Sequence, residues 1–229
     1  MSESSNSYII YIGFISKEEV MLKIGIIIGS TRPNRVGAEV GRWVFDQCQL
    51  RNDAEFELVD LISFNLPLLD EPVPPLMATE YAKEHTKIWS EKINSLDAFI
   101  FVSPEYNHST SGALKNAIDY LYREWNDKAA GFVSYGSMGG VRAVEHLRLI
   151  MAELQVATVR SQVALSLMTD FENFSVFKPA PYHQKNLDTL IDQLLKWGKI
   201  LKTVRVGDES ENIILDTLGT ESVVNQEIQ

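Results

Sequence analysis

Short apolar runs alternate with amphipathic stretches along the middle of the chain. Five runs, at residues 22–28, 55–61, 97–102, 129–135 and 158–165, have the length and the β-branched and aromatic content of strands. Runs such as GIII and FIFV are apolar at consecutive positions, as in strands that are covered on both faces. The pattern therefore predicts a parallel sheet between two layers of helices.

Helical periodicity fills the intervals between these runs. Apolar residues recur three or four positions apart in residues 37–49, 80–94, 112–123, 141–154 and 184–203. Five strands with alternating helices predict a doubly wound, flavodoxin-like α/β fold of three layers, α/β/α, with strand order 2-1-3-4-5. In such a fold, ligands bind beyond the carboxyl ends of the strands.

The composition is that of one globular domain. The 229 residues are 45% hydrophobic and 23% charged, enough to bury one sizeable core. Cys48 is the only cysteine, which excludes a disulfide framework and favours a reducing compartment, and the four histidines show no metal-ligand spacing. No apolar run reaches the roughly 20 residues of a membrane-spanning helix, and the first residues lack the positive charge of a signal peptide. We therefore expect a cytoplasmic protein without a bound metal.

The formal net charge is −10, and much of it lies at the two ends of the chain. Six acidic residues and one arginine occupy residues 204–229, whereas the middle is close to neutral. This distribution argues against nucleic-acid and membrane partners, and it predicts a flexible acidic tail at 204–229. Because the first strand starts directly after Met21, residues 1–20 are expected to be a flexible or mis-annotated extension, which leaves residues 21–203 as the folded domain.

A loop with phosphate-binding chemistry follows the first predicted strand. Residues 29–37 read GSTRPNRVG and lead into a helix, whose free N–H groups and dipole attract an anion. Ser30 and Thr31 add hydroxyl donors, and Arg32 and Arg35 can form charge-assisted bonds. The dinucleotide and P-loop fingerprints are absent, and the loop lacks the cysteine nucleophile of a phosphatase. The loop therefore predicts a site for a phosphate monoester.

Two more loops follow strands that end at the same edge of the sheet. Residues 103–121 read SPEYNHSTSGALKNAIDYL, in which Tyr106 and Asn107 offer an aromatic face and an amide to a flat heterocycle. For His108 we expect a hydrogen bond that stabilises this loop. Residues 135–140 (YGSMGG) permit close backbone approach and lead into a helix N-terminus, which would stabilise a redox ring that gains negative charge.

The motifs GSTRPNR, PEYNHSTSGALKNAIDYL and YGSMGG, in this order and spacing, resemble the NADPH-dependent FMN reductase family, which includes flavin-dependent quinone and azo reductases. The resemblance covers roughly residues 23–202. It implies that three groups of residues bind FMN. The phosphate would be surrounded by Ser30, Arg32, Asn34, Arg35, Val36 and Gly37; the flavin and ribityl chain would be held by Pro104, Glu105, Tyr106 and Asn107; the remaining flavin edge would be lined by Tyr135, Gly136, Ser137, Gly139 and Gly140.

The resemblance also implies an activity, that of an FMN-dependent NAD(P)H oxidoreductase. NADPH or NADH would deliver hydride to bound FMN, and a small-molecule acceptor, whether quinone, azo, nitro or flavin, would then take its place in ping-pong kinetics. Hydride transfer needs no acidic or basic side chain, so no catalytic residue is assigned. A homodimer, or a homotetramer built from dimers, is implied, with residues 67–75 and the helix at 112–123 as candidate contacts.

Two other functions stay open. A flavodoxin-type electron carrier would hold FMN without oxidising NAD(P)H, and a regulatory domain would bind phosphate without flavin. Residues 67–75 contain four prolines and must form a loop. This loop could cap the site or meet a partner subunit, or it could be a rigid connector.

Overall fold

The structure is a computed structural model, and it describes residues 21–224. The expected extension, residues 1–20, lies outside the described residues, as do the last five residues of the predicted tail. No helix within the described range is both long and apolar enough to cross a membrane.

Five strands form one parallel sheet in the order β2-β1-β3-β4-β5, which confirms the predicted flavodoxin-like topology. The strands are β1 (Lys23–Ile28), β2 (Glu55–Asp60), β3 (Ala98–Pro104), β4 (Ala129–Gly136) and β5 (Ala157–Ser166). The central strands β3 and β4 are buried at every position because helices cover both of their faces. Each strand lies within two residues of its predicted bounds.

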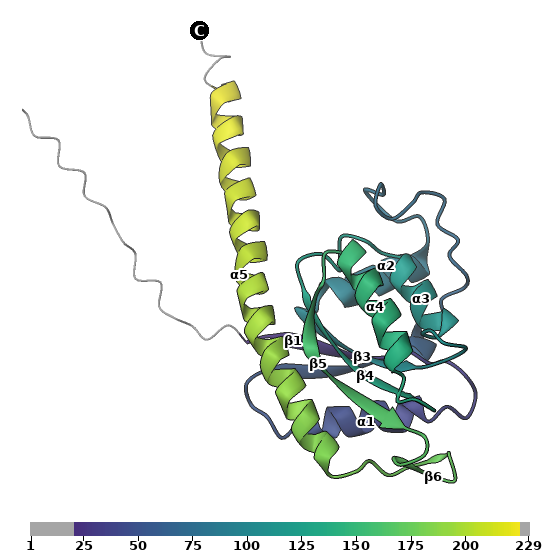
Figure 1. Cartoon of the computed structure of the whole chain (residues 1–229). Helices are drawn as coiled ribbons and strands as arrows, with labels where there is room; N and C mark the ends of the chain where they lie inside the picture. Colours follow the sequence, from purple (N-terminus) through teal and green to yellow (C-terminus); the bar gives the residue numbers. More distant parts are fainter. Residues whose placement is uncertain (1–20, 225–229) are drawn as a thin grey trace, which may run out of the picture.

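Helices form a layer on each side of the sheet. α1 (Gly37–Cys48) and α5 (Tyr182–Val224) lie on one face, and α2 (Glu84–Asn94), α3 (Gly112–Asp119) and α4 (Val141–Glu153) lie on the other (Figure 1). The apolar faces predicted from the periodicity are buried in two separate cores, one on each side. The three-layer α/β/α prediction is therefore confirmed.

Two helices on one face are shorter than the periodicity predicts. α2 was expected to begin at residue 80 but begins at Glu84, because the Glu71 carboxylate accepts the N–H groups of Ala82 (3.0 Å) and Lys83 (2.9 Å) and holds them in the preceding loop. α3 was expected to reach residue 123 but ends at Asp119, where the chain passes into tight turns that bury the Trp125 ring.

The last helix is longer than predicted, and three small elements were not predicted. α5 runs past residue 203 to Val224, through sequence without a proline to stop it, so the tail begins as a helix. The 3-10 helix η1 (Leu61–Phe64) continues directly from β2. β6 (Phe171–Glu172) and β7 (Val176–Phe177) form a hairpin whose two-residue strands are too short to give a periodic signal.

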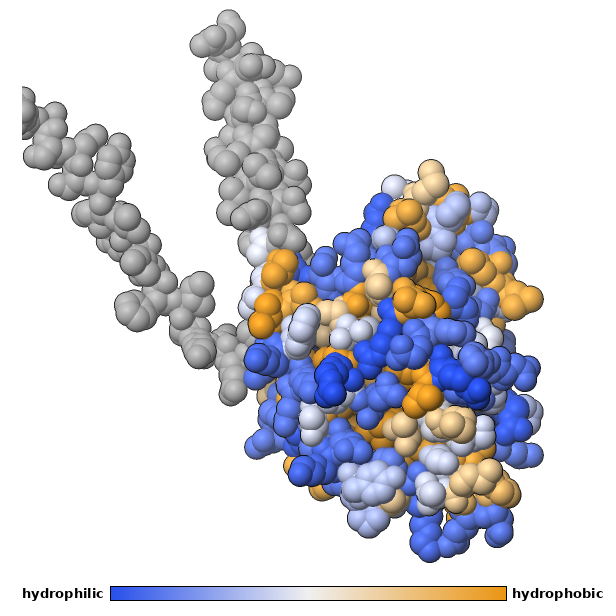
Figure 2. Space-filling view, viewed as in Figure 1, coloured by the Kyte–Doolittle hydropathy of each residue, from blue (hydrophilic) through white to orange (hydrophobic). Residues whose placement is uncertain are grey.

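The proline-rich segment forms a loop between η1 and α2, as predicted. The Asn116 side chain of α3 anchors it by donating to the Pro67 carbonyl (2.6 Å) and accepting from the Leu69 N–H (2.9 Å). The loop exposes large apolar side chains: Leu68, within the anchored part, is 85% exposed, and Met77, beyond it, is 71% exposed. Apolar patches interrupt the polar surface in Figure 2, including the region where Figure 1 places this loop.

Candidate functional site

The carboxyl ends of β1, β3 and β4 bring the three predicted loops together. The Ser30 Oγ of the first loop lies 2.8 Å from the Tyr106 Oη of the second, within hydrogen-bond distance. The Glu105 N–H donates to the Tyr135 carbonyl at the end of β4 (2.9 Å), which ties the second loop to the third. Residues that are more than a hundred positions apart in the sequence therefore share one edge of the sheet.

The first loop ends at a helix N-terminus that no side chain caps. Val36, at the N-cap of α1, accepts the Glu39 N–H with its carbonyl (3.0 Å) but has no side-chain oxygen to accept the first N–H groups of the helix. Asn34 adopts a left-handed backbone conformation (φ +55°), which turns the chain into the helix. Gly37 lies directly under the Tyr135 hydroxyl, and a side chain at this position would collide with it. The helix end is thus open to an acceptor from outside the chain.

The Tyr135 hydroxyl is buried beside this helix end. It has no hydrogen-bond partner within the described part of the chain, although the side chain is only 5% exposed. Burial raises the pKa of Tyr135 and the neighbouring Tyr106 adds to this, whereas the nearby Ser30 hydroxyl and the positive charges of Arg32 and Arg35 oppose it. The phenol is therefore protonated at neutral pH and can donate to an anion above α1.

The two arginines of the loop lie in different surroundings. Arg32 is exposed, whereas Arg35 is largely buried and forms an ion pair with Asp60 at the end of β2. The Arg35 Nε is buried without a hydrogen-bond partner among residues 21–224. The sequence did not predict the pairing with Asp60; one guanidinium edge is held by the protein and another remains free for a ligand.

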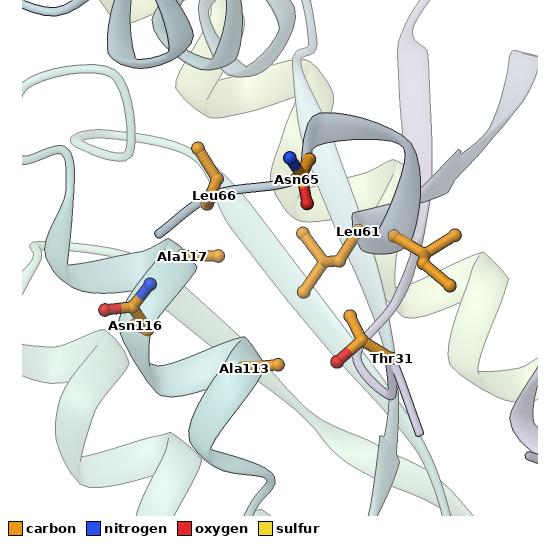
Figure 3. Close-up of a pocket in the computed structure, with 8 residues that line it drawn as sticks. Thr31, Leu61, Asn65, Leu66, Ala113, Asn116 and Ala117 are labelled. Carbon is orange, nitrogen blue, oxygen red and sulfur yellow. The ribbon is translucent and has the colours of Figure 1, made fainter. Parts of the chain in front are cut away.

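Thr31 lies on the other side of the first loop. It lines a cavity of about 140 Å³ together with residues around η1, among them Leu61 and Asn65, and residues of α3, among them Ala113 and Asn116 (Figure 3). Figure 3 shows the side chains of the three segments facing one another across this space. Thr31, predicted as a phosphate donor, thus lines a cavity of mixed polar and apolar character.

The second loop closes in a tight turn. Tyr106 and Ser109 exchange backbone hydrogen bonds (2.9 and 3.2 Å), and both central residues, Asn107 and His108, have positive φ. This is the geometry of a type I′ turn, which presents both exposed side chains at the rim. His146 of α4 also supports the loop, since its Nδ1 lies 2.9 Å from the Ser109 Oγ. For His108 the predicted hydrogen bond is not found within the described part of the chain.

The third loop approaches the site with its backbone. Gly139 (φ +71°) and Gly140 (φ +73°) have left-handed conformations, and the Ser134 hydroxyl donates to the Gly139 carbonyl (2.7 Å). Gly136 and the neighbouring Pro104 are buried at the strand ends, while Ser137 is exposed at the tip. The glycine-rich loop is therefore rigidly attached to β4 and open to a ligand at its tip.

Glu105 has a structural role that the sequence did not reveal. Its nearly buried carboxylate pairs with Arg142 and accepts the Arg142 N–H (3.2 Å) in the first turn of α4. The carboxylate thus occupies the helix end that was predicted to stabilise negative charge on a bound ring. The spacing of Glu105 and Arg142, 37 residues apart, gives no signal of this contact in the sequence.

These observations can be compared with what a phosphate monoester requires. An uncapped helix end, the unpaired Tyr135 hydroxyl, the unpaired Arg35 Nε and the exposed Arg32 all supply donors or positive charge. Buried polar groups without partners are rare in folded chains, so two of them beside one helix end indicate a missing acceptor. The residues present therefore fit the phosphate of FMN.

Comparison with known proteins agrees with this fit. The family model for NADPH-dependent FMN reductase matches residues 22–170. An NAD(P)H-dependent FMN reductase of a Nectria species is 43% identical over 159 residues, which cover 66% of this chain and 79% of that protein. A probable NADPH:quinone oxidoreductase of rice (Oryza sativa subsp. japonica) is 31% identical over 146 residues, covering 59% of this chain and 66% of that one.

A solved structure shares the fold. The flavoenzyme NAD(P)H:(acceptor) oxidoreductase FerB of Paracoccus denitrificans superposes with a TM-score of 0.62 at 21% identity, covering 77% of this chain and 98% of the other. The family match extends through the three loops of the site and more than half of the chain. The chain therefore belongs to the NADPH-dependent FMN reductase family of flavodoxin-like oxidoreductases.

Proposed function

We propose that this chain binds FMN at the carboxyl edge of its sheet and reduces small quinone-type acceptors with NAD(P)H. When bound, FMN supplies the redox chemistry: it takes a hydride from reduced nicotinamide and passes electrons to the acceptor. The observation that carries the proposal is the pair of unpartnered buried groups, Tyr135 Oη and Arg35 Nε, beside the uncapped end of α1.

The protein's contribution is to bind and orient the cofactor. The first loop supplies donors and charge to the phosphate, with Arg35 held in place by Asp60. The turn at Asn107 and His108 and the glycines of the third loop form the rim around the ring. No side chain of this edge has to move a proton during hydride transfer, so we assign no catalytic residue.

The acceptor and the kinetic order are inferred from the openness of this rim. The turn at Asn107 and the tip at Ser137 are exposed, so nicotinamide and acceptor can use the same face in turn, as ping-pong kinetics require. The rice relative, named a quinone oxidoreductase, supports quinones as the acceptor class. Azo, nitro and free flavin acceptors, and the choice between NADPH and NADH, stay predictions for a substrate screen.

The deciding experiment compares the reductase with a flavodoxin-type carrier. FMN-loaded protein is mixed with NADPH under anaerobic conditions, and the absorbance of oxidised flavin is followed. Complete bleaching within seconds, and recovery of the colour when benzoquinone is added, are expected for the reductase. A protein that stays yellow with both NADPH and NADH is a carrier, and a preparation that does not bind added FMN contradicts both functions.

Steady-state kinetics then test the order of binding. Double-reciprocal plots at several fixed quinone concentrations are expected to give parallel lines, because the first product leaves before the acceptor binds. Intersecting lines would mean that nicotinamide and acceptor are bound together, and the proposal of one shared face would be abandoned.

A further inference from the structure

A second open cavity lies at the opposite edge of the sheet from the three loops. It has a volume of about 500 Å³ and is formed by residues before β3 and β4 together with α5. The parallel strands place their amino ends here, so this cavity is separated from the FMN edge by the length of the sheet. It plays no part in the function proposed above.

The lining of this cavity has an excess of positive charge. Arg123, Lys128, Lys202 and Arg205 line it together with only two acidic residues, Asp97 and Asp127. The Asp97 carboxylate is shared between the Lys202 Nζ (2.8 Å) and the Arg205 guanidinium (2.9 Å), so it balances one of these two charges. Because the net charge of the whole chain is −10, this local excess of positive charge sets the cavity apart from the average charge of the protein.

Lys128 is the buried member of this cluster. Its side chain donates to the carbonyls of Ile93 (2.9 Å) and Asn94 (3.4 Å) at the end of α2, while the residue is only 4% exposed. These carbonyls carry partial charges only, and the Phe99 ring, whose centroid lies 5.5 Å from the Nζ, is neutral. Within the described chain no carboxylate lies within ion-pair distance of the ammonium group. Burying an ammonium without a counter-ion is unfavourable, so the site lacks a compensating anion.

The pKa of Lys128 is consistent with this lack of a counter-ion. Burial and, to a smaller extent, the like charge of Arg205 lower the pKa of Lys128 to about 7, and the carboxylates of Asp97 and Glu124 only partly oppose this. An anion bound in the cavity would favour the charged ammonium. Binding of an anion and retention of the Lys128 proton are therefore coupled.

We propose that this cavity binds a doubly charged oxyanion of the phosphate class, either the free ion or the phosphate of a small metabolite. The Arg123 and Arg205 guanidinium groups provide planar donors suited to phosphate, and the Asn126 amide adds a neutral polar group to the lining. The volume exceeds that of an inorganic ion, so a small organic phosphate also fits.

The first test is a calorimetric titration of FMN-loaded protein with sulfate. FMN keeps the phosphate site of the first loop filled, and chloride keeps the ionic strength constant, so non-specific screening cancels. We expect saturable binding at one site near pH 6.5. Arg123→Gln removes an exposed cation of the lining and is expected to weaken binding about ten-fold.

A matched variant controls for net charge. Lys23 lies at the same edge of the sheet, but its ammonium pairs with Glu57 (3.3 Å) outside the cavity. Lys23→Met should leave sulfate binding unchanged, whereas Lys128→Met should weaken it about ten-fold or more. If Lys128→Met does not fold, the sulfate affinity of Arg123→Gln and its dependence on pH test the proposal instead. Absence of saturable binding, or equal affinity in Arg123→Gln and Lys23→Met, would overturn the proposal.

The pH series uses sulfate because its charge is constant between about pH 6 and 9. The charged groups that face Lys128 are Arg205 from α5, Asp97 before β3 and Glu124 before β4, and the lowered pKa of Lys128 brings its own titration into this pH range. Sulfate affinity should fall as the pH rises from 6 to 8; a constant affinity contradicts the proposal. Tighter binding of glycerol phosphate than of inorganic phosphate assigns the site to organic phosphates, and the reverse assigns it to the free ion.

Discussion

Arg32 and Arg35 lie three positions apart in the first loop but are expected to respond differently to substitution. Arg32 is exposed, so Arg32→Ala should cost FMN affinity alone, about 10- to 100-fold for a lost charge-assisted bond. Arg35→Ala leaves Asp60 without its partner, so it should also lower the free energy of unfolding of the apoprotein by about 1–3 kcal/mol. Flavin fluorescence titration and urea denaturation measure the two effects separately. Unchanged FMN affinity in both variants would mean that the FMN phosphate does not bind at this loop.

Tyr135 allows a test in which affinity and stability change in opposite directions. In the apoprotein its buried hydroxyl lacks a partner, so Tyr135→Phe should leave the melting temperature unchanged or raise it. If the hydroxyl donates to the FMN phosphate, the same variant should bind FMN about 10-fold more weakly. Reduced stability of the apoprotein together with unchanged FMN affinity would mean that the hydroxyl serves the fold instead.

At this scale the sequence predicted which residue types gather but not where each side chain points. The resemblance assigned Tyr135 to the flavin edge, whereas its hydroxyl lies over Gly37 in the phosphate loop. The pairing of Arg35 with Asp60 depends on the register that places Ile28 beside Asp60 in neighbouring strands. Contacts of this kind depend on tertiary packing, which the local sequence pattern does not carry.

Among the elements, α4 depends on the backbone conformation of the loop before it. Gly140 has φ +73°, and a Cβ there would lie 2.7 Å from the Ser134 Cβ and 2.8 Å from the Tyr135 N. Gly140→Ala should therefore lower the free energy of unfolding by more than about 1 kcal/mol and displace the third loop.

Gly112 is the matched control for this substitution. It also lies at the start of a helix, but a Cβ there would meet nothing within 4 Å, and its φ is not positive. Gly112→Ala should be neutral or stabilising by about 0.4–1 kcal/mol, measured by urea denaturation. Equal losses in the two alanine variants would show that the left-handed conformation of Gly140 is not required.

Asp170 joins the end of β5, the hairpin and α5. Burial by itself raises the pKa of Asp170, but hydrogen bonds from the Ala180 N–H, the Thr169 hydroxyl and the Ser166 N–H outweigh it, and the net pKa is lowered. A carboxyl whose pKa is lowered on folding stabilises the fold above its unfolded value of about 3.8, and this contribution is lost as the pH falls through the lower, folded value.

The corresponding variant is Asp170→Asn. It should lower the free energy of unfolding by about 3 kcal/mol at pH 7, and the difference from the unsubstituted protein should shrink below about pH 4. Asp53→Asn, which weakens a more exposed pair with Arg51, should cost less than about 1 kcal/mol. A difference that stays the same from pH 7 down to about pH 2 would contradict the assigned ionisation of Asp170.

Long elements, in which the apolar pattern repeats several times, were predicted well, whereas short elements were not. All five strands of the parallel sheet and all five α-helices were expected from hydrophobic patterning, because burial on a sheet or helix face imposes it. η1 depends on a local contact, in which the Asp60 side chain accepts the Ile62 N–H (3.3 Å), and the β6–β7 hairpin packs through the Phe171 and Phe177 rings (centroids 5.2 Å apart). Helix ends also depended on distant groups, as the Glu71 contacts before α2 illustrate.

On the scale of the whole molecule, the two edges of the sheet carry different chemistry. The carboxyl edge gathers donors for a phosphate and an open rim for a flat ring, and the amino edge gathers four cations around two carboxylates. The parallel sheet enforces this division because all strand ends of one kind meet at one edge. Substitutions at the amino edge should therefore leave FMN affinity unchanged.

The exposed apolar side chains of the proline-rich loop lead to a prediction about assembly. Leu68 and Met77, 85% and 71% exposed, project from the loop before α2, and such apolar groups in one segment are typical of an interface. We therefore expect a homodimer with this loop in the contact, as the family resemblance implied. The measurement is sedimentation equilibrium of the FMN-loaded protein, alone and with Leu68→Glu and Met77→Glu.

Each of these two substitutions should raise the dimer dissociation constant about ten-fold or more, because a carboxylate would be buried without a partner in the interface. Leu50 is as exposed as Leu68, at 80%, but follows α1 on the opposite face of the sheet. Leu50→Glu adds the same charge and should leave the dimer intact. If all three variants dissociate alike, net charge and not this loop controls assembly; if none does, the dimer uses another face of the molecule.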